Sequence, residues 1–196
     1  MIKRLIDIIA SAFGLVILSP ILIVAAIAVK LGSPGPVFFR QIRTGKDLRP
    51  FLIFKFRTMV NRAPRLGAPI TASGDPRITK IGRMLRATKL DEIPQLLNVL
   101  AGDMSLVGSR PEDPRFVRLF KTEYRELLRG RPGITDPASL KYRNESDLLA
   151  HSRHPEREYV RRILPAKLQI SLAYARRATT ISDLAIIFRT ILAVAR

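Results

Sequence analysis

The spacing of hydrophobic and polar residues changes from one part of the chain to the next. Residues 8–29 contain no charged side chain, which predicts a long apolar helix. Residues 37–43 and 51–59 are rich in aromatic and β-branched side chains and enclose a turn at 44–47, so they predict a β-hairpin. Residues 61–76 are rich in Pro, Gly and Ala and predict a loop that is able to order over a ligand.

Four later segments have the periodicity of helices. Residues 78–88 form a short basic segment, and residues 92–101 carry a leucine-rich stripe that stops at Gly102. Residues 114–129 combine an apolar side with a basic side, and a last apolar helix starts at Ser182 as its N-cap. We expect the basic side and the last helix to rest on a membrane surface, with solvent exposure and core packing as the respective alternatives. The apolar side of 114–129 is expected to comprise Phe116, Leu119, Phe120, Tyr124, Leu127 and Leu128.

The first apolar segment is long enough to cross a lipid bilayer. At ~1.5 Å per helical residue, residues 8–29 would extend about 33 Å, against about 30 Å for the hydrocarbon core. Pro20 lies near the middle and cannot donate a backbone hydrogen bond, and the hydroxyl of Ser19 can bond back to the carbonyl of Leu15. The Ser19-Pro20 pair therefore predicts a break or bend in the helix.

Positive charges lie on both sides of this segment. Lys3 and Arg4 precede it, and Lys30 begins a run of cations that reaches Arg49. Because cytoplasmic flanks are enriched in Lys and Arg, the pattern favours a re-entrant helix whose two ends both lie in the cytoplasm. A Pro-kinked spanning helix, a secretory signal and a buried core helix remain as alternatives at this point.

Composition and charge narrow the class of protein. The chain has 196 residues, with 34 Lys or Arg against 16 Asp or Glu, a formal charge of +18 and no Cys. The length fits one domain with an appendage, and a hydrophobic content of 47% excludes a disordered chain. The positive charge indicates a polyanionic partner, which is nucleic acid, an anionic membrane or a phosphorylated substrate. The lack of Cys excludes a disulfide framework, a thiolate metal site and a cysteine nucleophile.

Two adjacent carboxylates are the strongest candidates for chemistry. Asp91 and Glu92 stand at the start of the 92–101 segment, with Asp91 as the expected N-cap, where backbone N–H groups and the helix dipole suit phosphate oxygens. Arg86 precedes the pair and Arg110 follows it. In so basic a chain, this pattern indicates a phosphate-transfer site in which arginines bind the anion and a carboxylate attacks or binds Mg²⁺. Ordinary helix capping is the simpler alternative.

Other polar residues are less specific. Lys55 and Arg57 share one face of the second strand, where they are either solvated or in contact with phosphate. His151 and His154 lie in a polar stretch without a partner motif and are expected at the surface. The chain has no Walker loop, no G-x-S-x-G and no H-E-x-x-H, so several common enzyme classes are excluded.

Five separated motifs are informative together. They are Ser19-Pro20, Lys55-Phe56-Arg57-Thr58-Met59, Leu90-Asp91-Glu92-Ile93-Pro94-Gln95, Gly102-Asp103-Met104-Ser105-Leu106-Val107-Gly108 and Arg131-Pro132-Gly133-Ile134-Thr135. In this order they resemble the motifs of the bacterial sugar transferase family, the monotopic phosphoglycosyl transferases that start cell-envelope glycoconjugates. The resemblance covers essentially the whole chain.

The resemblance implies an α+β fold with a small β-hairpin and amphipathic helices at the membrane interface. Residues 1–34 would form a re-entrant membrane anchor and residues 35–196 a cytosolic catalytic domain. The implied reaction moves a sugar-1-phosphate from a UDP-sugar to polyprenyl (undecaprenyl) phosphate and releases UMP, with Mg²⁺ as cofactor. The implied location is the cytoplasmic face of the bacterial inner membrane. Anionic phospholipid is an expected partner, a homo-oligomer is compatible with the sequence, and no nucleic acid is expected.

The resemblance also implies roles for individual residues. Asp91 matches the nucleophile that forms a covalent phospho-sugar intermediate. Glu92 matches the second member of the dyad, which assists proton transfer or Mg²⁺ placement, so both carboxylates are expected near the metal. Ser19-Pro20 matches the break that turns the membrane helix back. The residues expected to compensate the charge of the diphosphate are Lys55, Arg57, Arg86, Arg110 and Arg143.

Two features depart from the family pattern, and two other functions stay open. Ser109 stands where the family commonly has Pro, and residues 136–142 replace a run with Gly and aromatic residues, which affects nucleotide and sugar recognition. The alternative function is a membrane-tethered nucleic-acid binder in which residues 78–100 form two helices around a turn. The acidic pair would then face DNA phosphates. The remaining alternative is a non-catalytic scaffold at the membrane surface.

Overall fold

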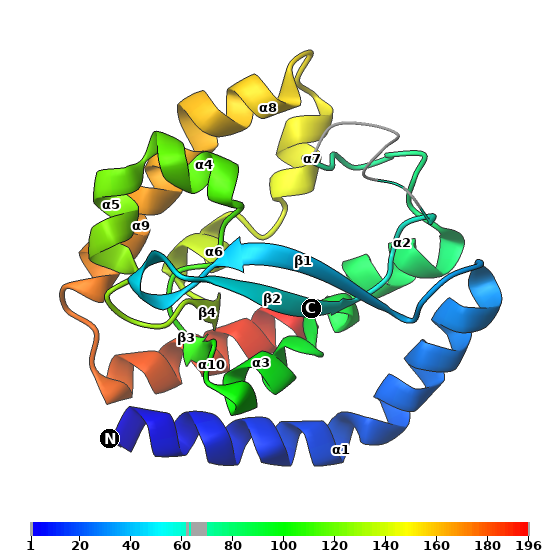
Figure 1. The fold of residues 1–196 in the computed structure, drawn as a ribbon, viewed down its shortest axis with the longest axis horizontal. Coiled ribbons are helices and arrows are strands. Elements are labelled where there is room, and N and C mark those ends of the chain that lie inside the picture. The colour runs from blue at the N-terminus through cyan, green and yellow to red at the C-terminus, as the bar shows by residue number, and fades with distance from the viewer. Residues whose placement is uncertain (1, 62, 64–69, 196) are drawn as a thin grey trace.

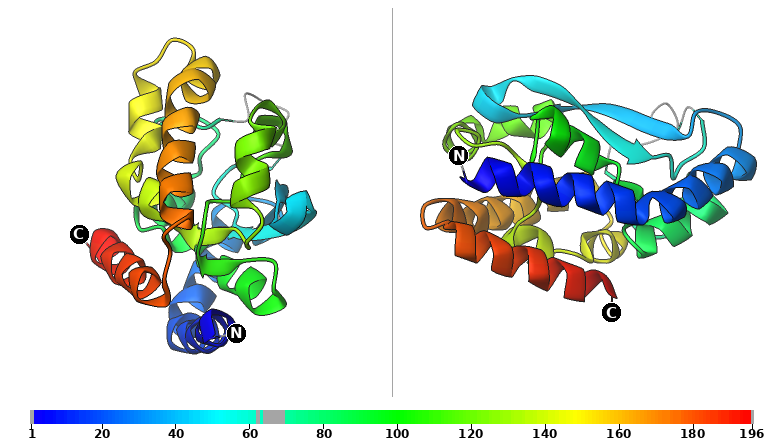
Figure 2. Two further views of the ribbon diagram at one scale, coloured as in Figure 1. Left: turned by 90° about the vertical axis from the view of Figure 1, so that its left-hand side faces the viewer. Right: turned by 90° about the horizontal axis from the view of Figure 1, so that it is seen from below.

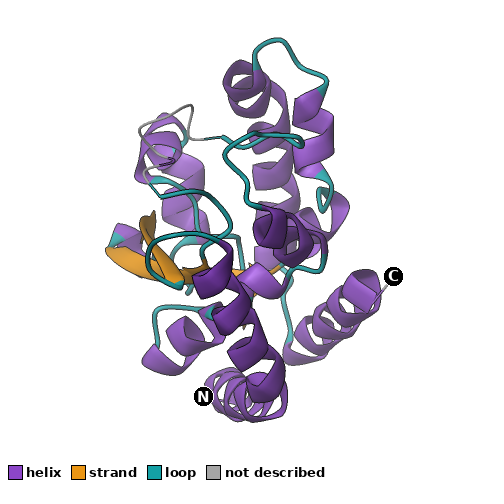
Figure 3. Ribbon diagram, turned by 90° about the vertical axis from the view of Figure 1, so that its right-hand side faces the viewer, coloured by secondary structure: helices purple, strands orange, loops and turns teal. Residues whose placement is uncertain are grey.

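The computed structural model describes residues 2–61, 63 and 70–195. The fold is α+β: helices pack around a small parallel sheet, a two-stranded hairpin lies at the surface, and one long N-terminal helix runs along one side (Figure 1). Figure 3 shows how little of this structure is strand. The longer elements are α1 (Ile2–Gly32), β1 (Phe38–Thr44), β2 (Pro50–Phe56), α2 (Lys80–Ala87), α3 (Gln95–Ala101), α4 (Pro114–Leu119), α5 (Lys121–Leu127), α9 (Leu164–Ala175) and α10 (Thr180–Ala195).

The shorter elements connect these helices and strands. A parallel pair of three-residue strands, β3 and β4, lies in the middle of the molecule (Figure 1). The short elements are the 3₁₀ turns η1 (Lys46–Leu48) and η3 (Leu90–Glu92), β3 (Ser105–Val107), β4 (Gly133–Thr135), α6 (Pro137–Lys141), α7 (Glu145–Ala150), α8 (Pro155–Glu158) and the π-helical turn η4 (Tyr159–Ile163).

Helix α1 is continuous but bent (Figure 1). Pro20 has no N–H to donate to the carbonyl of Val16, and the hydroxyl of Ser19 donates to that oxygen instead, at 2.7 Å. The expected bond from Ser19 to Leu15 is therefore wrong, because proline leaves Val16 as the carbonyl without a backbone donor. Among the described segments, α1 is the one helix long and apolar enough to cross a membrane by length and composition. Whether it re-enters the membrane stays a prediction.

The β-hairpin is confirmed, although its second strand is shorter than expected. Strands β1 and β2 pair antiparallel, with Phe38 opposite Phe56 and Thr44 opposite Pro50. The strand ends at Phe56, so Arg57 lies beyond it and does not share a strand face with Lys55. The expected loop at 61–76 lies partly outside the described residues.

The basic helix predicted at 78–88 is confirmed as α2, but two other helices differ from prediction. The segment 114–129 is broken at Phe120, whose backbone (φ −127°, ψ 46°) separates α4 from α5. This break turns Leu119 out of the core, where 61% of its surface is exposed. The last helix starts at Thr180 rather than with Ser182 as N-cap. Thr179 and Ser182 exchange reciprocal side-chain to backbone hydrogen bonds, a capping box in which Thr179 is the cap.

Two glycines allow the parallel strands to meet closely. An added Cβ on Gly133 would lie 2.1 Å from the backbone nitrogen of Gly108, so only glycine fits at this position. The backbone bonds Gly108 N–H to Thr135 carbonyl and Gly133 N–H to Ser109 carbonyl then continue the pairing past β3, at 3.0 and 2.9 Å. The backbone leading into Arg110 is fixed in this way.

Three apolar clusters among the described residues hold the elements together. One joins α4, α5, α7, η4 and α9, a second joins the C-terminal half of α1 to β2 and α2, and a third joins β2 to α3. The hairpin, α2 and α3 are thus anchored to one another through apolar contacts, and the acidic pair lies in the segment that links α2 to α3.

Candidate active site

The acidic pair occupies a 3₁₀ turn of its own. Lys89 adopts a left-handed backbone conformation (φ 56°) and starts η3, whereas α3 begins only at Gln95. The prediction that Asp91 caps the 92–101 helix is therefore wrong, because η3 ends at Glu92 and Pro94 is the N-cap of α3. The site depends on side chains from other elements rather than on the N-terminus of α3.

Glu92 is held by two cations. Lys55 of β2 lies 2.8 Å from its Oε1, and Arg110 binds both of its oxygens with a fork of two N–H groups, one of them at 2.8 Å. Burial alone would raise the pKa of Glu92, but Arg110 and Lys55 together hold that pKa well below its usual range. Glu92 therefore stays an anion at physiological pH.

Asp91 has the opposite environment. Its surface is only 8% exposed, and no described residue donates a hydrogen bond to its carboxylate. Burial, and next the charge of Glu92, raise the pKa of Asp91 to about 6, although Lys55, Arg86 and Arg110 oppose the shift. A carboxylate in this state is more basic than a solvated one and is ionised for the most part at pH 7, which suits a nucleophile or base.

Arg86 adds a third cation beside the pair. Its Nε donates to the hydroxyl of Thr58 at 2.8 Å, and neither terminal nitrogen donates to a described residue. Gly82 lets α2 approach Thr58 this closely, because an added Cβ there would lie 2.0 Å from the Thr58 carbonyl oxygen. The charge of Arg86 acts on both Asp91 and Glu92, and its free terminal nitrogens are available to an anionic ligand.

Asn98 is a positioning residue that the sequence did not reveal. Its buried amide accepts from the N–H of Phe54 at 3.0 Å and donates to the carbonyl of Leu52 at 2.7 Å. These two bonds tie α3 to β2 on either side of Ile53, so Lys55 is brought opposite Glu92. An Asn within a leucine-rich helix carries no sequence signal for such a role.

Two of the predicted phosphate ligands do not join the cluster. Arg57 donates to the carbonyls of Val29, Ser33 and Pro34, at 3.1, 2.6 and 2.7 Å, and so closes the C-terminal end of α1. Arg143 is exposed and donates to the carbonyl of Ala193 at 2.9 Å. The structure thus groups Lys55, Arg86 and Arg110 around the dyad and places the guanidinium groups of Arg57 and Arg143 on backbone carbonyls of helix ends.

Other parts of the predicted surface agree with the structure. His151 and His154 are exposed, as expected. Helix α3 packs against α1 and β2 and buries Leu96 and Val99, and the side chains that it leaves exposed, Leu97 and Ala101, are apolar and do not suit a DNA groove. The nucleic-acid alternative finds no support in this arrangement.

The donor set fits a metal ion only in part. Among the residues that the structure describes, no group of three or more His, Cys, Asp or Glu side chains could hold a metal ion. Both oxygens of Glu92 are engaged by Arg110, which does not fit its predicted role as an Mg²⁺ ligand. The oxygens of Asp91 accept no hydrogen bond from the residues that the structure describes. Mg²⁺ commonly takes one or two carboxylates and completes its shell with substrate phosphates and water, so Asp91 fits an ion that arrives with a diphosphate.

The arrangement can stabilise an anion next to a reactive carboxylate. Attack by Asp91 on a phosphate brings negative charges together, and the three cations from β2, α2 and the segment after β3 offset that repulsion. The same cations would bind a phosphate that leaves. This chemistry suits phosphoryl transfer through an acyl phosphate.

Comparisons with known proteins agree with the site. The family described as bacterial sugar transferase matches residues 1–196. A UDP-N-acetylgalactosamine-undecaprenyl-phosphate N-acetylgalactosaminephosphotransferase of Aeromonas hydrophila is 44% identical over 144 residues, covering 71% of this chain and 34% of the relative. Two UDP-glucose:undecaprenyl-phosphate glucose-1-phosphate transferases are also similar. That of Caulobacter vibrioides is 44% identical over 71% of this chain and 53% of its own length. That of Escherichia coli is 37% identical over 97% of this chain and 39% of its own.

These relatives are longer proteins, and the chain spans about a third to about a half of their length. The match nevertheless includes the apolar helix, the hairpin, the dyad and the parallel strands, because the family covers every residue. The chain belongs to the bacterial sugar transferase family.

Proposed function

We propose that this protein transfers a sugar-1-phosphate from a UDP-sugar to polyprenyl phosphate, with Asp91 as the nucleophile. The observation that carries the proposal is the state of Asp91: buried, free of hydrogen bonds from described residues, with a pKa of about 6, and surrounded by Lys55, Arg86 and Arg110. The names of relatives in the same family support the substrate classes, since they include undecaprenyl phosphate and UDP-sugars.

The reaction takes two displacements. First, a carboxylate oxygen of Asp91 attacks the β-phosphorus of the UDP-sugar, the bond from that phosphorus to the bridging oxygen breaks, and UMP leaves with the electron pair. The product is an aspartyl phospho-sugar. Second, a phosphate oxygen of polyprenyl phosphate attacks the same phosphorus and the bond to Asp91 breaks. The carboxylate is regenerated, and the lipid carries a diphosphate-linked sugar.

The cations and Glu92 have separate tasks in this scheme. Arg86 offers its terminal nitrogens to the diphosphate, and Lys55 and Arg110 offset the charge that accumulates on the leaving UMP. Glu92 orients Lys55 and Arg110 rather than carrying a proton, because the pKa of Glu92 is held well below its usual range. Mg²⁺, held by Asp91 and the phosphates of the donor, would supply further charge neutralisation.

The outward faces of α1 and α10 support a seat in one leaflet of the membrane. Both helices lie on the same side of the molecule (Figure 2), and both expose large apolar side chains. On α1, Phe13 and Val16 are 65% and 71% exposed, and on α10, Ile181 and Phe188 are 80% and 61% exposed. Such faces suit burial in lipid rather than contact with water.

The contacts of α1 support a re-entrant course. Its first half packs against α3, and in its second half Ala25 and Val29 pack with Phe56 and Leu85. Since both halves contact the same domain, both ends of α1 lie on the side of the membrane where that domain lies. The cationic flanks put that side in the cytoplasm. The chain is thus monotopic in this proposal.

The catalytic proposal is tested with purified protein, Mg²⁺, a panel of UDP-sugars and polyprenyl phosphate, following UMP. We expect UMP release by the natural chain, none by Asp91→Asn, and normal release by Asp47→Asn, a matched control on the exposed turn η1. Incubation with a donor radiolabelled in the sugar, without acceptor, should label Asp91, as shown by peptide mapping after denaturation. Turnover by Asp91→Asn, or a label on another residue, would overturn the assignment.

The topology is tested with single cysteines, because the natural chain has none. Ile2→Cys and Lys46→Cys place a thiol on either side of the apolar part of α1. A membrane-impermeant thiol reagent should label both only after spheroplasts are opened. Labelling of either cysteine in intact spheroplasts would contradict the re-entrant course.

A further inference from the structure

The N-terminal turn of α1 carries polar side chains that face the fold rather than the membrane. Arg4 donates to the carbonyls of Val99 and Leu100, at 2.6 and 3.0 Å, and so binds the C-terminal end of α3. These are the carbonyls that a helix end leaves without backbone partners. The first turns of α1 are therefore hydrogen-bonded to α3, the helix that follows the dyad.

Asp7 is hydrogen-bonded to β3, the strand that leads to Arg110. Its carboxylate is 4% exposed and accepts hydrogen bonds from the hydroxyl of Ser105 at 2.8 Å and from the N–H of Leu106 at 3.0 Å. A buried carboxylate is expensive unless it is hydrogen-bonded, so this contact defines one position of β3 against α1. Arg110 follows β3 by three residues.

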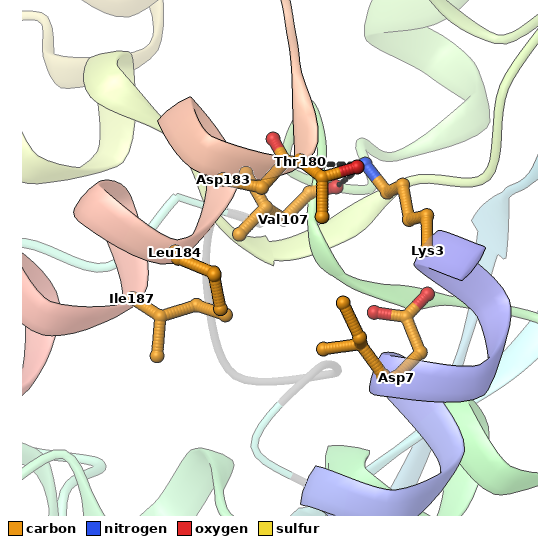
Figure 4. Close-up of a pocket in the computed structure, with 8 residues that line it drawn as sticks. Lys3, Asp7, Val107, Thr180, Asp183, Leu184 and Ile187 are labelled. Atoms are coloured by element: carbon orange, nitrogen blue, oxygen red, sulfur yellow. Dashed lines mark hydrogen bonds and ion pairs between the residues drawn. The ribbon is translucent and has the colours of Figure 1, made fainter.

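Lys3 extends the junction to α10. Its Nζ donates to the carbonyl of Val107 at 2.9 Å and pairs with the carboxylate of Asp183 at 2.8 Å, which also accepts from the hydroxyl of Tyr174 at 2.6 Å. Figure 4 shows Lys3 and Asp7 reaching from α1, with Asp183 opposite on α10 and Val107 on β3, around a small cavity of about 10 Å³. Three elements therefore meet through polar contacts at this junction.

The inference that follows rests on the proposed activity, and it relates this polar junction to the position of Arg110 in the site. We propose that Asp7 is a positioning residue: by fixing β3 to α1, while Arg4 fixes α3, it sets the place of Arg110 against Glu92 and so the charge around Asp91. The close contact of Gly108 with Gly133 transmits this position, because the backbone between β3 and Arg110 is hydrogen-bonded there to β4. Asp7 acts through Arg110 and touches no substrate.

The test compares Asp7→Ala with Asp7→Asn. The Asn oxygen still accepts from Leu106 N–H and its amide donates to the Ser105 hydroxyl, so Asp7→Asn should retain the natural rate. Asp7→Ala loses both bonds, and we expect the single-turnover burst of UMP to slow about tenfold with the KM for the UDP-sugar unchanged. The low-pH limb of its rate profile should move to higher pH, because Arg110 then lowers the pKa of Asp91 less. A loss of folded protein alone would lower the burst amplitude without moving that limb.

Ser11→Ala is the matched control. Ser11 lies on α1, is fully buried, and its hydroxyl has no partner among the described residues, so its removal should leave the rate and the pH profile unchanged. Should Asp7→Ala fail to fold, Ser105→Ala removes one of the two bonds and should show a smaller shift of the same limb.

Three results would overturn the inference. They are a natural burst rate and pH profile in Asp7→Ala, equal impairment of Asp7→Asn and Asp7→Ala, and an unshifted limb in Ser105→Ala when Asp7→Ala does not fold. Failure of the proposed function is distinguishable, because it would appear as turnover by Asp91→Asn. An inactive Asp91→Asn together with an unaffected Asp7→Ala would refute the positioning role alone.

Discussion

The first displacement should slow as Asp91 takes up a proton. With a pKa of about 6, the ionised fraction of Asp91 falls from about nine-tenths at pH 7 to about one-tenth at pH 5. An aspartate at the ordinary value of 3.8 would stay more than about nine-tenths ionised over the same range. We therefore expect the rate of UMP formation to drop about tenfold between pH 7 and pH 5.

The assay is a rapid-quench burst with Mg²⁺ and UDP-sugar and without acceptor. Polyprenyl phosphate is left out because the second ionisation of a phosphate monoester, near pH 6, would overlap that of Asp91. The diphosphate of the donor has no ionisation in this range, so the low-pH limb reports the protein. Burst amplitude measures the active fraction and burst rate measures the chemistry.

Lys55→Met is the informative variant. Lys55 lowers the pKa of Asp91, so its removal should move the low-pH limb to higher pH, whereas Asp47→Asn should leave the limb in place. A limb near pH 4 in the natural chain would refute the reasoning about burial. A limb that moves to lower pH in Lys55→Met would refute the reasoning about charge.

Three further variants test the site and its support. Asp91→Asn should raise the free energy of unfolding by up to about 3 kcal/mol above pH 6 and by nothing below pH 4, because only the ionised form of a carboxylate with a raised pKa destabilises the fold; urea unfolding in detergent at both pH values measures this. Asn98→Ala should lower that free energy by about 2–4 kcal/mol and slow the burst, because two backbone groups of β2 lose their partners. Gly133→Ala should lower it by about 2 kcal/mol or more, as thermal unfolding would show, because a methyl group there overlaps Gly108.

Local pattern was sufficient for elements that are long or strictly periodic. The apolar run predicted α1, the alternating aromatic residues predicted the hairpin, and the basic segment at 78–88 predicted α2. Strands β3 and β4 were not predicted, because each has three residues and they are joined by pairing across more than twenty intervening residues. The break at Phe120 was also missed, because the helical spacing of apolar residues continues through Phe120 although the helix itself is interrupted there.

The roles of individual side chains were also predicted only in part. The family resemblance picked out Lys55, Arg86 and Arg110 as cations that compensate the charge of a diphosphate, and Arg86 and Arg110 also flank the acidic pair in the sequence. It also picked out Arg57, which the structure places on the carbonyls at the end of α1. A guanidinium binds a helix end and a phosphate through the same donors, so residue type alone cannot separate the two uses.

By itself, the order of residues determined the family, the apolar helix with its proline, the hairpin and the identity of the two adjacent acids, because each of these resides in neighbouring positions along the chain. Only the tertiary structure decided that Lys55 and Arg110 bind Glu92, whereas Asp91 accepts no hydrogen bond from the described residues. That difference arises from burial and from cations on three separate elements. The distances from these cations to the two carboxylates are set by packing between segments that are remote in the sequence.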